Sequence, residues 1–198
     1  MTVALVYDVE TTGIPGFSAR SDAPHQPHII EIAASLVNIG SREVVGGMSA
    51  FVCDSGPIPP EITELTGITT TTAEFFGIPC RDALSMFVSL WTRSQVRIAH
   101  NETFDARIIR IALKRMDYSD TADTWSASNS ECTARMATPI CKLPATDAMK
   151  AKTSFKYKTP TLAEAYQHLI GKPMQGAHRA ATDVAACIEI YFAIEDRQ

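Results

Sequence analysis

The apolar run of residues 3–9 carries Asp8 near its end and is followed directly by Glu10. The run is β-branched at its ends, which predicts a strand in the middle of a sheet. Residues two apart on a strand leave the same face, so both carboxylates are expected side by side. Neighbouring carboxylates repel and raise each other's pKa unless a cation lies between them. A strand end that turns into solvent is the simpler explanation if this pair is considered alone.

The 198 residues, 45% hydrophobic and 20% charged, predict one domain covering residues 1–198 with a substantial core. No apolar run approaches the roughly 18 residues that a membrane helix needs. The N-terminus has no basic region of the kind that begins a signal peptide. Five cysteines without a CxxC pair favour reduced thiols and a cytoplasmic location. A net charge of −4 argues against coating long nucleic acids, but a nuclease can carry its positive charge as metal ions.

The order of the expected elements predicts the class of the fold. Three strands come first, with a bulge at Gly46-Gly47, and their short connections favour antiparallel pairing. Residues 13–27 hold three prolines and two glycines and are expected to be irregular. Strands and helices then alternate, which predicts an α/β layout with a mixed sheet. The expected strands are 3–9, 28–37, 43–53, 96–99 and 131–134, and the expected helices are 59–67, 81–91, 101–116, 162–169 and 179–194.

Asp105 is expected in the first turn of the helix 101–116, directly after a strand. Ligands of α/β proteins gather at such junctions, although an acid there also stabilises the helix dipole. Asn101 is the expected N-cap of this helix, and Phe104 is expected in the core.

His178 precedes Asp183 by five residues and follows Gly176, which indicates a loop before an alanine-rich helix. Such a segment would hold the carboxylate on a rigid helix and leave the imidazole on the loop. Histidine exchanges a proton near neutral pH and therefore suits general-base catalysis. An exposed loop histidine is the structural alternative.

Together these residues predict a metal-dependent nuclease. Carboxylate oxygens favour Mg²⁺ or Mn²⁺ over zinc. Two such ions about 4 Å apart can activate a water and stabilise the leaving oxygen of a phosphoryl displacement. The predicted catalytic residues are Asp8, Glu10, Asp105, His178 and Asp183, and the four carboxylates among them are the predicted metal ligands.

Three segments resemble the motifs of the DEDDh group of 3′→5′ exonucleases, the DnaQ-like family that includes polymerase proofreading subunits. They are DVETTG, HNETFD and HRAATD, the last with the His-x4-Asp spacing of this subgroup. The segments IIEIA and IPPEITELTGI also look like family segments, so the resemblance covers most of residues 3–192. It implies an RNase H-like fold, with a five-stranded mixed β-sheet flanked by α-helices.

The resemblance also implies roles for single residues. Asp8, Glu10 and Asp183 would hold a first ion, Asp8 would share a second with support from Asp105, and His178 would be the general base. The residues expected near the terminal nucleotide are Thr11, Thr12, Leu65, Asn101 and Phe104.

The function implied is the release of nucleoside 5′-monophosphates from the 3′ ends of single-stranded DNA, with a DNA polymerase or other replication protein as a partner and no membrane. An exoribonuclease acting on short RNA or tRNA ends remains an alternative. A catalytically silent polymerase-accessory module is another, against which the presence of all five site residues argues.

Residues 142–158 fit the family pattern poorly. They carry five lysines against a single acid, interleaved with Phe155 and Tyr157. Basic and aromatic side chains together can bind a nucleic-acid backbone and stack on bases. A solvated surface loop is an equally good explanation.

Overall fold

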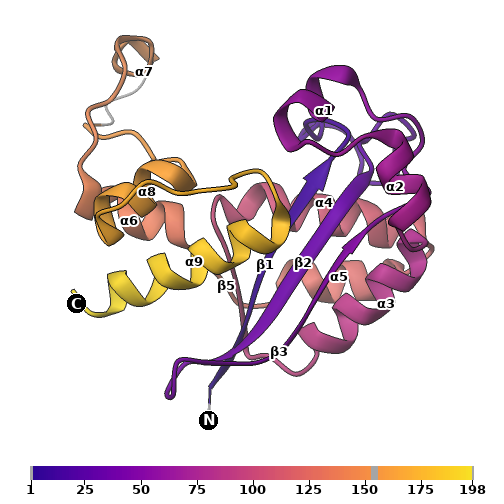
Figure 1. Ribbon diagram of the computed structural model, residues 1–198, viewed down its shortest axis with the longest axis horizontal. Helices are drawn as coiled ribbons and strands as arrows, with labels where there is room; N and C mark the ends of the chain where they lie inside the picture. Colours follow the sequence, from indigo (N-terminus) through magenta and orange to yellow (C-terminus); the bar gives the residue numbers. More distant parts are fainter. Residues whose placement is uncertain (1, 153–155, 198) are drawn as a thin grey trace.

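Five strands form one mixed sheet in the order β3-β2-β1-β4-β5 in the computed structural model, which describes residues 2–152 and 156–197 (Figure 1). Strands β1, β2 and β3 pair antiparallel, whereas β4 is parallel to both β1 and β5. The strands are β1 Val3–Thr11, β2 Ile29–Asn38, β3 Glu43–Phe51, β4 Val96–Ala99 and β5 Ser130–Cys132. This sheet confirms the predicted five-stranded mixed topology and the antiparallel pairing of the first three strands.

Helices cover both faces of this sheet (Figure 1). Helices α3, α4 and α5 lie on one face, while α9 lies on the other and packs against α6 and α8. Helices α1 and α2 pack at the start of β2 around Ile30 and Ile68. The helices are α1 Pro60–Thr66, α2 Thr70–Phe76, α3 Cys80–Trp91, α4 Glu102–Arg115, α5 Ser119–Ala127, α6 Thr133–Cys141, α7 Asp147–Lys152, α8 Leu162–Ile170 and α9 Ala180–Glu195.

The central strand β1 is buried on both faces, and its side chains alternate between two cores. Leu5 and Tyr7 join the cluster under α3, α4 and α5, whereas Ala4 and Val6 pack against α9. The alternation therefore turns the even-numbered Asp8 and Glu10 toward the face that α9 covers. The two carboxylates share one face of the sheet, as predicted.

Local signals explain several element ends. Gly67 ends α1 with a φ of 72°, and a capping box of Thr161 and Glu164 begins α8. The β2–β3 register shifts between Leu36 and Val37, next to the glycine pair where a bulge was predicted. A Cβ on Gly47 would lie 2.7 Å from the carbonyl oxygen of Ala34, so only glycine fits there without a shift.

Asn101 occupies the predicted N-cap position of α4, but its side chain does not cap the helix. Its backbone is left-handed, with a φ of 65°, and its side chain makes no hydrogen bond to the first turn of α4. An N-cap side chain normally reaches the first turn from an extended backbone. Here Asn101 instead reverses the chain between β4 and α4.

A buried ion pair fixes the start of α4. The Nε of Arg97, on β4, lies 2.8 Å from Oε1 of Glu102, and the two side chains are only 6% and 5% exposed. The Tyr7 hydroxyl donates to the same oxygen at 3.3 Å, and the guanidinium stacks 4.3 Å from the centre of the Trp125 ring. These contacts join β1, β4, α4 and α5 directly beside Asp105.

Within the described ranges, no helix has the length and apolar character needed to cross a bilayer. The cytoplasmic location and the single domain of residues 1–198 stay predictions.

Replacing Arg97 with methionine should destabilise the fold strongly, because it leaves the buried Glu102 carboxylate without its cation. We expect a loss of about 3–5 kcal/mol in the free energy of unfolding, measured by urea denaturation. Arg42→Met is the matched control, because Arg42 and Asp196 form an exposed pair with side chains 50% and 54% accessible. It should cost much less. Equal losses in the two variants would contradict a structural role for the buried pair.

Candidate active site

The predicted acids meet at the carboxyl end of β1. Pairing between β1 and β4 stops at Val6 and Ile98, so the next residues of β1 have no strand on that side. The Asp105 carboxylate, from the first turn of α4, accepts the freed Val9 N–H at 3.2 Å. Asp183 enters from the first turn of α9 on the opposite face. Two helices thus bring acids to one strand end from both sides of the sheet.

Glu10, His178 and Asp183 lie close enough together to hold one metal ion. Each offers one ligand atom, and the three atoms lie within 4.8 Å of one another. Asp183 is 8% exposed, and its Oδ1 has no hydrogen-bond partner among the described residues. Its Oδ2 accepts the His178 backbone N–H at 3.3 Å. A buried carboxylate oxygen without a partner next to a second carboxylate fits a divalent cation.

The charges of the four carboxylates act on one another. Burial raises the pKa of Asp8 well above its usual range, and the charges of Asp105, Asp183 and Glu10 raise it further. Burial also raises the pKa of Asp105, to which Glu10 adds. The pKa of Glu10 rises to about 7 through burial and the charge of Asp183. Burial raises the pKa of Asp183 to about 6. The structure therefore brings all four predicted ligands into one field of negative charge, which a bound cation would relieve.

Two residues outside the predicted set hold this site together. Glu31, on β2 opposite Glu10, is 2% exposed and accepts the Arg179 guanidinium at 2.9 Å. The same carboxylate accepts the Ala180 backbone N–H at 3.0 Å, at the first residue of α9. Glu31 therefore ties the start of α9 to β2, and the positive charge of Arg179 offsets part of the rise in the pKa of Glu10. Glu31 is the single acid within the apolar segment IIEIA, and this isolated charge in a buried strand was the sequence signal that could have identified it.

His178 stands just before α9 in a left-handed conformation, with a φ of 64°, and is exposed. A non-glycine residue rarely adopts this conformation, and Asp183 stabilises it by accepting the His178 N–H. The backbone of His178 is held by Asp183, while its exposed imidazole lies on the solvent side of Glu10 and Asp183, where a substrate could reach it.

Contact between a substrate and the five residues predicted to bind it stays a prediction, and the structure places these residues in different environments. Thr11 is buried and its hydroxyl donates to the Gly13 carbonyl at 2.6 Å, while the Thr12 hydroxyl accepts the His28 N–H at 2.9 Å. Leu65 is 51% exposed on α1, and Asn101 is also exposed. Phe104 is half-buried against the core, as expected.

Contact between the lysine-rich segment 142–158 and nucleic acid also stays a prediction. Lys150 pairs with Asp147 at 3.1 Å, and Lys158 pairs with Glu164. The Lys156 ammonium lies 5.4 Å from the centre of the Tyr157 ring. Phe155, which was part of that prediction, lies outside the described residues.

The chain matches the family model RNase_T, described as an exonuclease, over residues 5–191. It is 30% identical over 196 residues to a Mycobacterium tuberculosis protein named as a bifunctional exonuclease/endonuclease, covering 99% of this chain and 27% of that protein. It is also 30% identical over 190 residues to a DNA polymerase III PolC-type of Clostridium perfringens, covering 94% of this chain and 11% of the polymerase. This chain therefore spans about a quarter or less of these relatives.

Solved structures of E. coli exonuclease I share the fold. A zinc-bound complex with single-stranded DNA superposes with a TM-score of 0.74 at 19% identity, covering all of this chain and 41% of the other. A complex with a dA16 oligonucleotide gives 0.73 at 20% identity, with the same coverage. The likeness supports the RNase H-like architecture predicted from the motifs.

In metal-free solution, the protein should lose stability as the pH rises from about 4 to about 7. The pKa values of Glu10, about 7, and Asp183, about 6, lie above the usual carboxylate range, so the folded state keeps protons that the unfolded chain has released. That advantage is present at low pH and disappears as the pH passes these values. Because one pKa unit corresponds to about 1.4 kcal/mol and water partly screens Glu10, its share should be about 2 kcal/mol.

Urea denaturation in chelator across this pH range measures the effect. Glu10→Gln should flatten the decline, whereas Asp82→Asn, an exposed acid on α3, should leave it unchanged. A decline of the same size in Glu10→Gln would show that the carboxylate cluster is not its source.

Proposed function

Since this chain belongs to the RNase_T family of exonucleases, we propose that it is a metal-dependent 3′→5′ exonuclease that releases nucleoside 5′-monophosphates from single-stranded DNA. The observation that carries the proposal is the convergence of Asp8, Glu10, Asp105 and Asp183, with a buried Asp183 oxygen that has no hydrogen-bond partner in the described part of the chain. Acids held together in this way destabilise a fold unless a cation binds between them.

DNA is the favoured substrate on two grounds. The solved structures with this fold include exonuclease I bound to single-stranded DNA and to a dA16 oligonucleotide. Several relatives are named as DNA polymerase III PolC-type, which also makes a replication polymerase the favoured partner. Cleavage of RNA ends is the alternative that the experiment below separates.

The proposed cofactor is a pair of Mg²⁺ or Mn²⁺ ions. Asp8, Glu10 and Asp183 would hold one ion, and Asp8 with Asp105 would hold the other. When bound, such ions supply Lewis-acid activation of a water and stabilise charge on the leaving oxygen.

The chain's own residues supply position and proton transfer. The hydrogen bond from Val9 and the buried Arg97–Glu102 pair keep Asp105 at the strand end. The Glu31–Arg179 pair holds the segment that carries His178. The exposed imidazole of His178 takes the proton from the attacking water, and it stands on the open side of Glu10 and Asp183.

The deciding experiment compares DNA and RNA oligonucleotides of equal length and sequence, labelled at the 5′ end, with Mg²⁺, with Mn²⁺ or with chelator. We expect stepwise shortening from the 3′ end, faster on DNA, only when a divalent ion is present. A 3′-blocked oligonucleotide should resist, and mass spectrometry should identify nucleoside 5′-monophosphates. Faster shortening of RNA would reassign the substrate, and no release from either would end the enzyme proposal.

Asp183→Asn should reduce turnover by several orders of magnitude while the protein stays folded. The amide keeps the size of the side chain but removes a charge that the cations need, and its loss relieves repulsion in the metal-free state. Circular dichroism and thermal denaturation check the fold, and Asp82→Asn should keep full turnover. Near-normal turnover in Asp183→Asn would remove Asp183 from the site.

His178→Ala should lower turnover by roughly 10²–10⁴, through loss of general-base catalysis. Metal affinity, measured by titration calorimetry with Mn²⁺, should change little. The control is His168→Ala, an exposed histidine on α8. A parallel loss of metal affinity would instead identify His178 as a ligand.

A further inference from the structure

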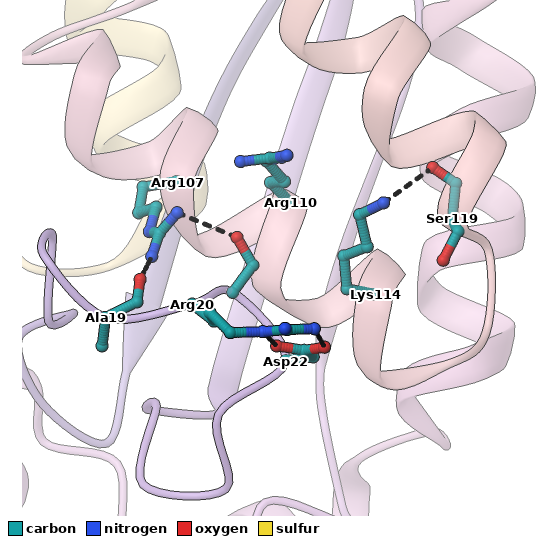
Figure 2. A pocket seen from close by; sticks show the side chains of 8 residues that line it. Ala19, Arg20, Asp22, Arg107, Arg110, Lys114 and Ser119 are labelled. Atoms are coloured by element: carbon teal, nitrogen blue, oxygen red, sulfur yellow. Dashed lines mark hydrogen bonds and ion pairs between the residues drawn. The ribbon is translucent and has the colours of Figure 1, made fainter.

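A basic cavity of about 430 Å³ lies on the outer side of α4, against the irregular loop that follows β1 (Figure 2). Helix α4 contributes Arg107, Arg110 and Lys114, and the loop contributes Arg20 and Asp22. Arg107 also holds the loop in place, since its guanidinium donates to Ser21 Oγ at 2.8 Å and to the Ala19 carbonyl. One wall of the cavity is therefore fixed by one of its own cations.

Positive charge exceeds negative charge in this cavity. Arg20 and Asp22 form an exposed pair that neutralises itself. Arg110 and Lys114 share one carboxylate, Asp123, at 3.3 and 3.0 Å, and that side chain is 60% exposed. Among the residues that the structure describes, no acid pairs with Arg107, and burial, followed by the neighbouring charge of Arg110, lowers its pKa. Four cations thus face two carboxylates in a chain whose net charge is −4.

The cavity is distinct from the carboxylate cluster, although α4 contributes to both. Asp105 is 3% exposed and directed at Val9 of β1. The three cations recur at intervals of three and four residues, which places them on one face of the helix. Asp8, Glu10, Asp105 and Asp183 are absent from its lining. Helix α4 therefore presents its acid to the sheet and its cations to the outer cavity.

An aromatic side chain stands beside the cations. A neighbouring depression of about 250 Å³ shares Arg107 and Arg110 with the cavity and is also lined by Phe17. Phe17 is 56% exposed, so its ring is accessible to a base beside the cations. Cations that bind phosphate and an exposed ring that stacks on a base are the two contacts that a nucleotide unit needs.

We propose that this cavity is a second nucleotide-binding site, in which Arg110, Lys114 and Arg107 bind a phosphate group and Phe17 stacks on the attached base. The phosphate belongs either to an inner nucleotide of the strand or to a free nucleoside monophosphate. The strand form of the proposal rests on the proposed exonuclease function; the site itself does not, because its ligand binds without metal.

Binding is measured in chelator at low salt, where the metal-free carboxylates repel phosphate and the basic cavity does not. The probes are a fluorescently labelled oligothymidylate, followed by anisotropy, and thymidine 5′-monophosphate, followed by calorimetry. Arg110→Gln/Lys114→Gln should weaken binding roughly tenfold, because charge-assisted hydrogen bonds to phosphate are lost. Arg107 is left intact, since it also holds the loop.

Two further variants make the result specific. Arg93→Gln/Lys172→Gln removes two exposed cations outside the cavity and should bind like the unaltered protein. Asp123→Asn removes the acid that competes for Arg110 and Lys114 and should tighten binding, which a misfolded protein could not do.

The two probes distinguish the sources of the phosphate. If only the oligothymidylate loses affinity in the double variant, the site takes an inner phosphate of the strand. The slope of log binding constant against log salt concentration should then decrease in magnitude by about 0.7. If thymidine 5′-monophosphate loses affinity as well, the site takes a free nucleotide. Unchanged binding of both probes would overturn the proposal, whereas failure of the exonuclease proposal would be seen separately, as no nucleotide release with metal.

Discussion

Mutual repulsion among four carboxylates at the end of one strand is the constraint on which the rest of the structure depends. Burial and proximity raise the pKa values of Asp8, Glu10, Asp105 and Asp183 together. Arg179, whose charge partly offsets the rise in the pKa of Glu10, is itself paired with Glu31. Such a cluster persists only if the surrounding fold is stable enough to hold it, and it is suited to a divalent cation for the same reason.

Two ion pairs stabilise the arrangement of the carboxylates, and each lies at the start of a helix that carries one of the site acids. Arg97 of β4 holds Glu102, at the start of α4, three residues before Asp105. Glu31 of β2 holds Arg179, at the start of α9, four residues before Asp183. The two pairs lie on opposite sides of β1, and together they fix the direction from which each acid approaches. The same positioning leaves the outer face of α4 free for cations.

The sequence pattern was sufficient for the strands, for the longer helices and for the side of the sheet to which Asp8 and Glu10 point, because local periodicity determines these features. It was insufficient for α2, which begins with a run of threonines, for α5, and for α6, which contains Pro139. The N-cap position of Asn101 was predictable, but its left-handed backbone and missing side-chain cap were not, because a left-handed turn and an N-cap favour the same residue type. The pairing of Glu31 with Arg179 joins residues 148 positions apart, and nothing local specifies such a contact.

The pairing of β1 on both edges has a further consequence for the sequence changes that this protein can tolerate. The backbone of β1 is hydrogen-bonded to β2 along its length and to β4 near its start. A shift in the register of β1 would therefore break its pairing with both neighbours. A strand that gains or loses one residue before Asp8 turns every later side chain to the other face. Both carboxylates would then enter the aromatic layer around Phe87 and Trp125. A change in the length of this segment is therefore more disruptive than an exchange of one of its apolar side chains for another, because only the length change moves Asp8 and Glu10 to the wrong face.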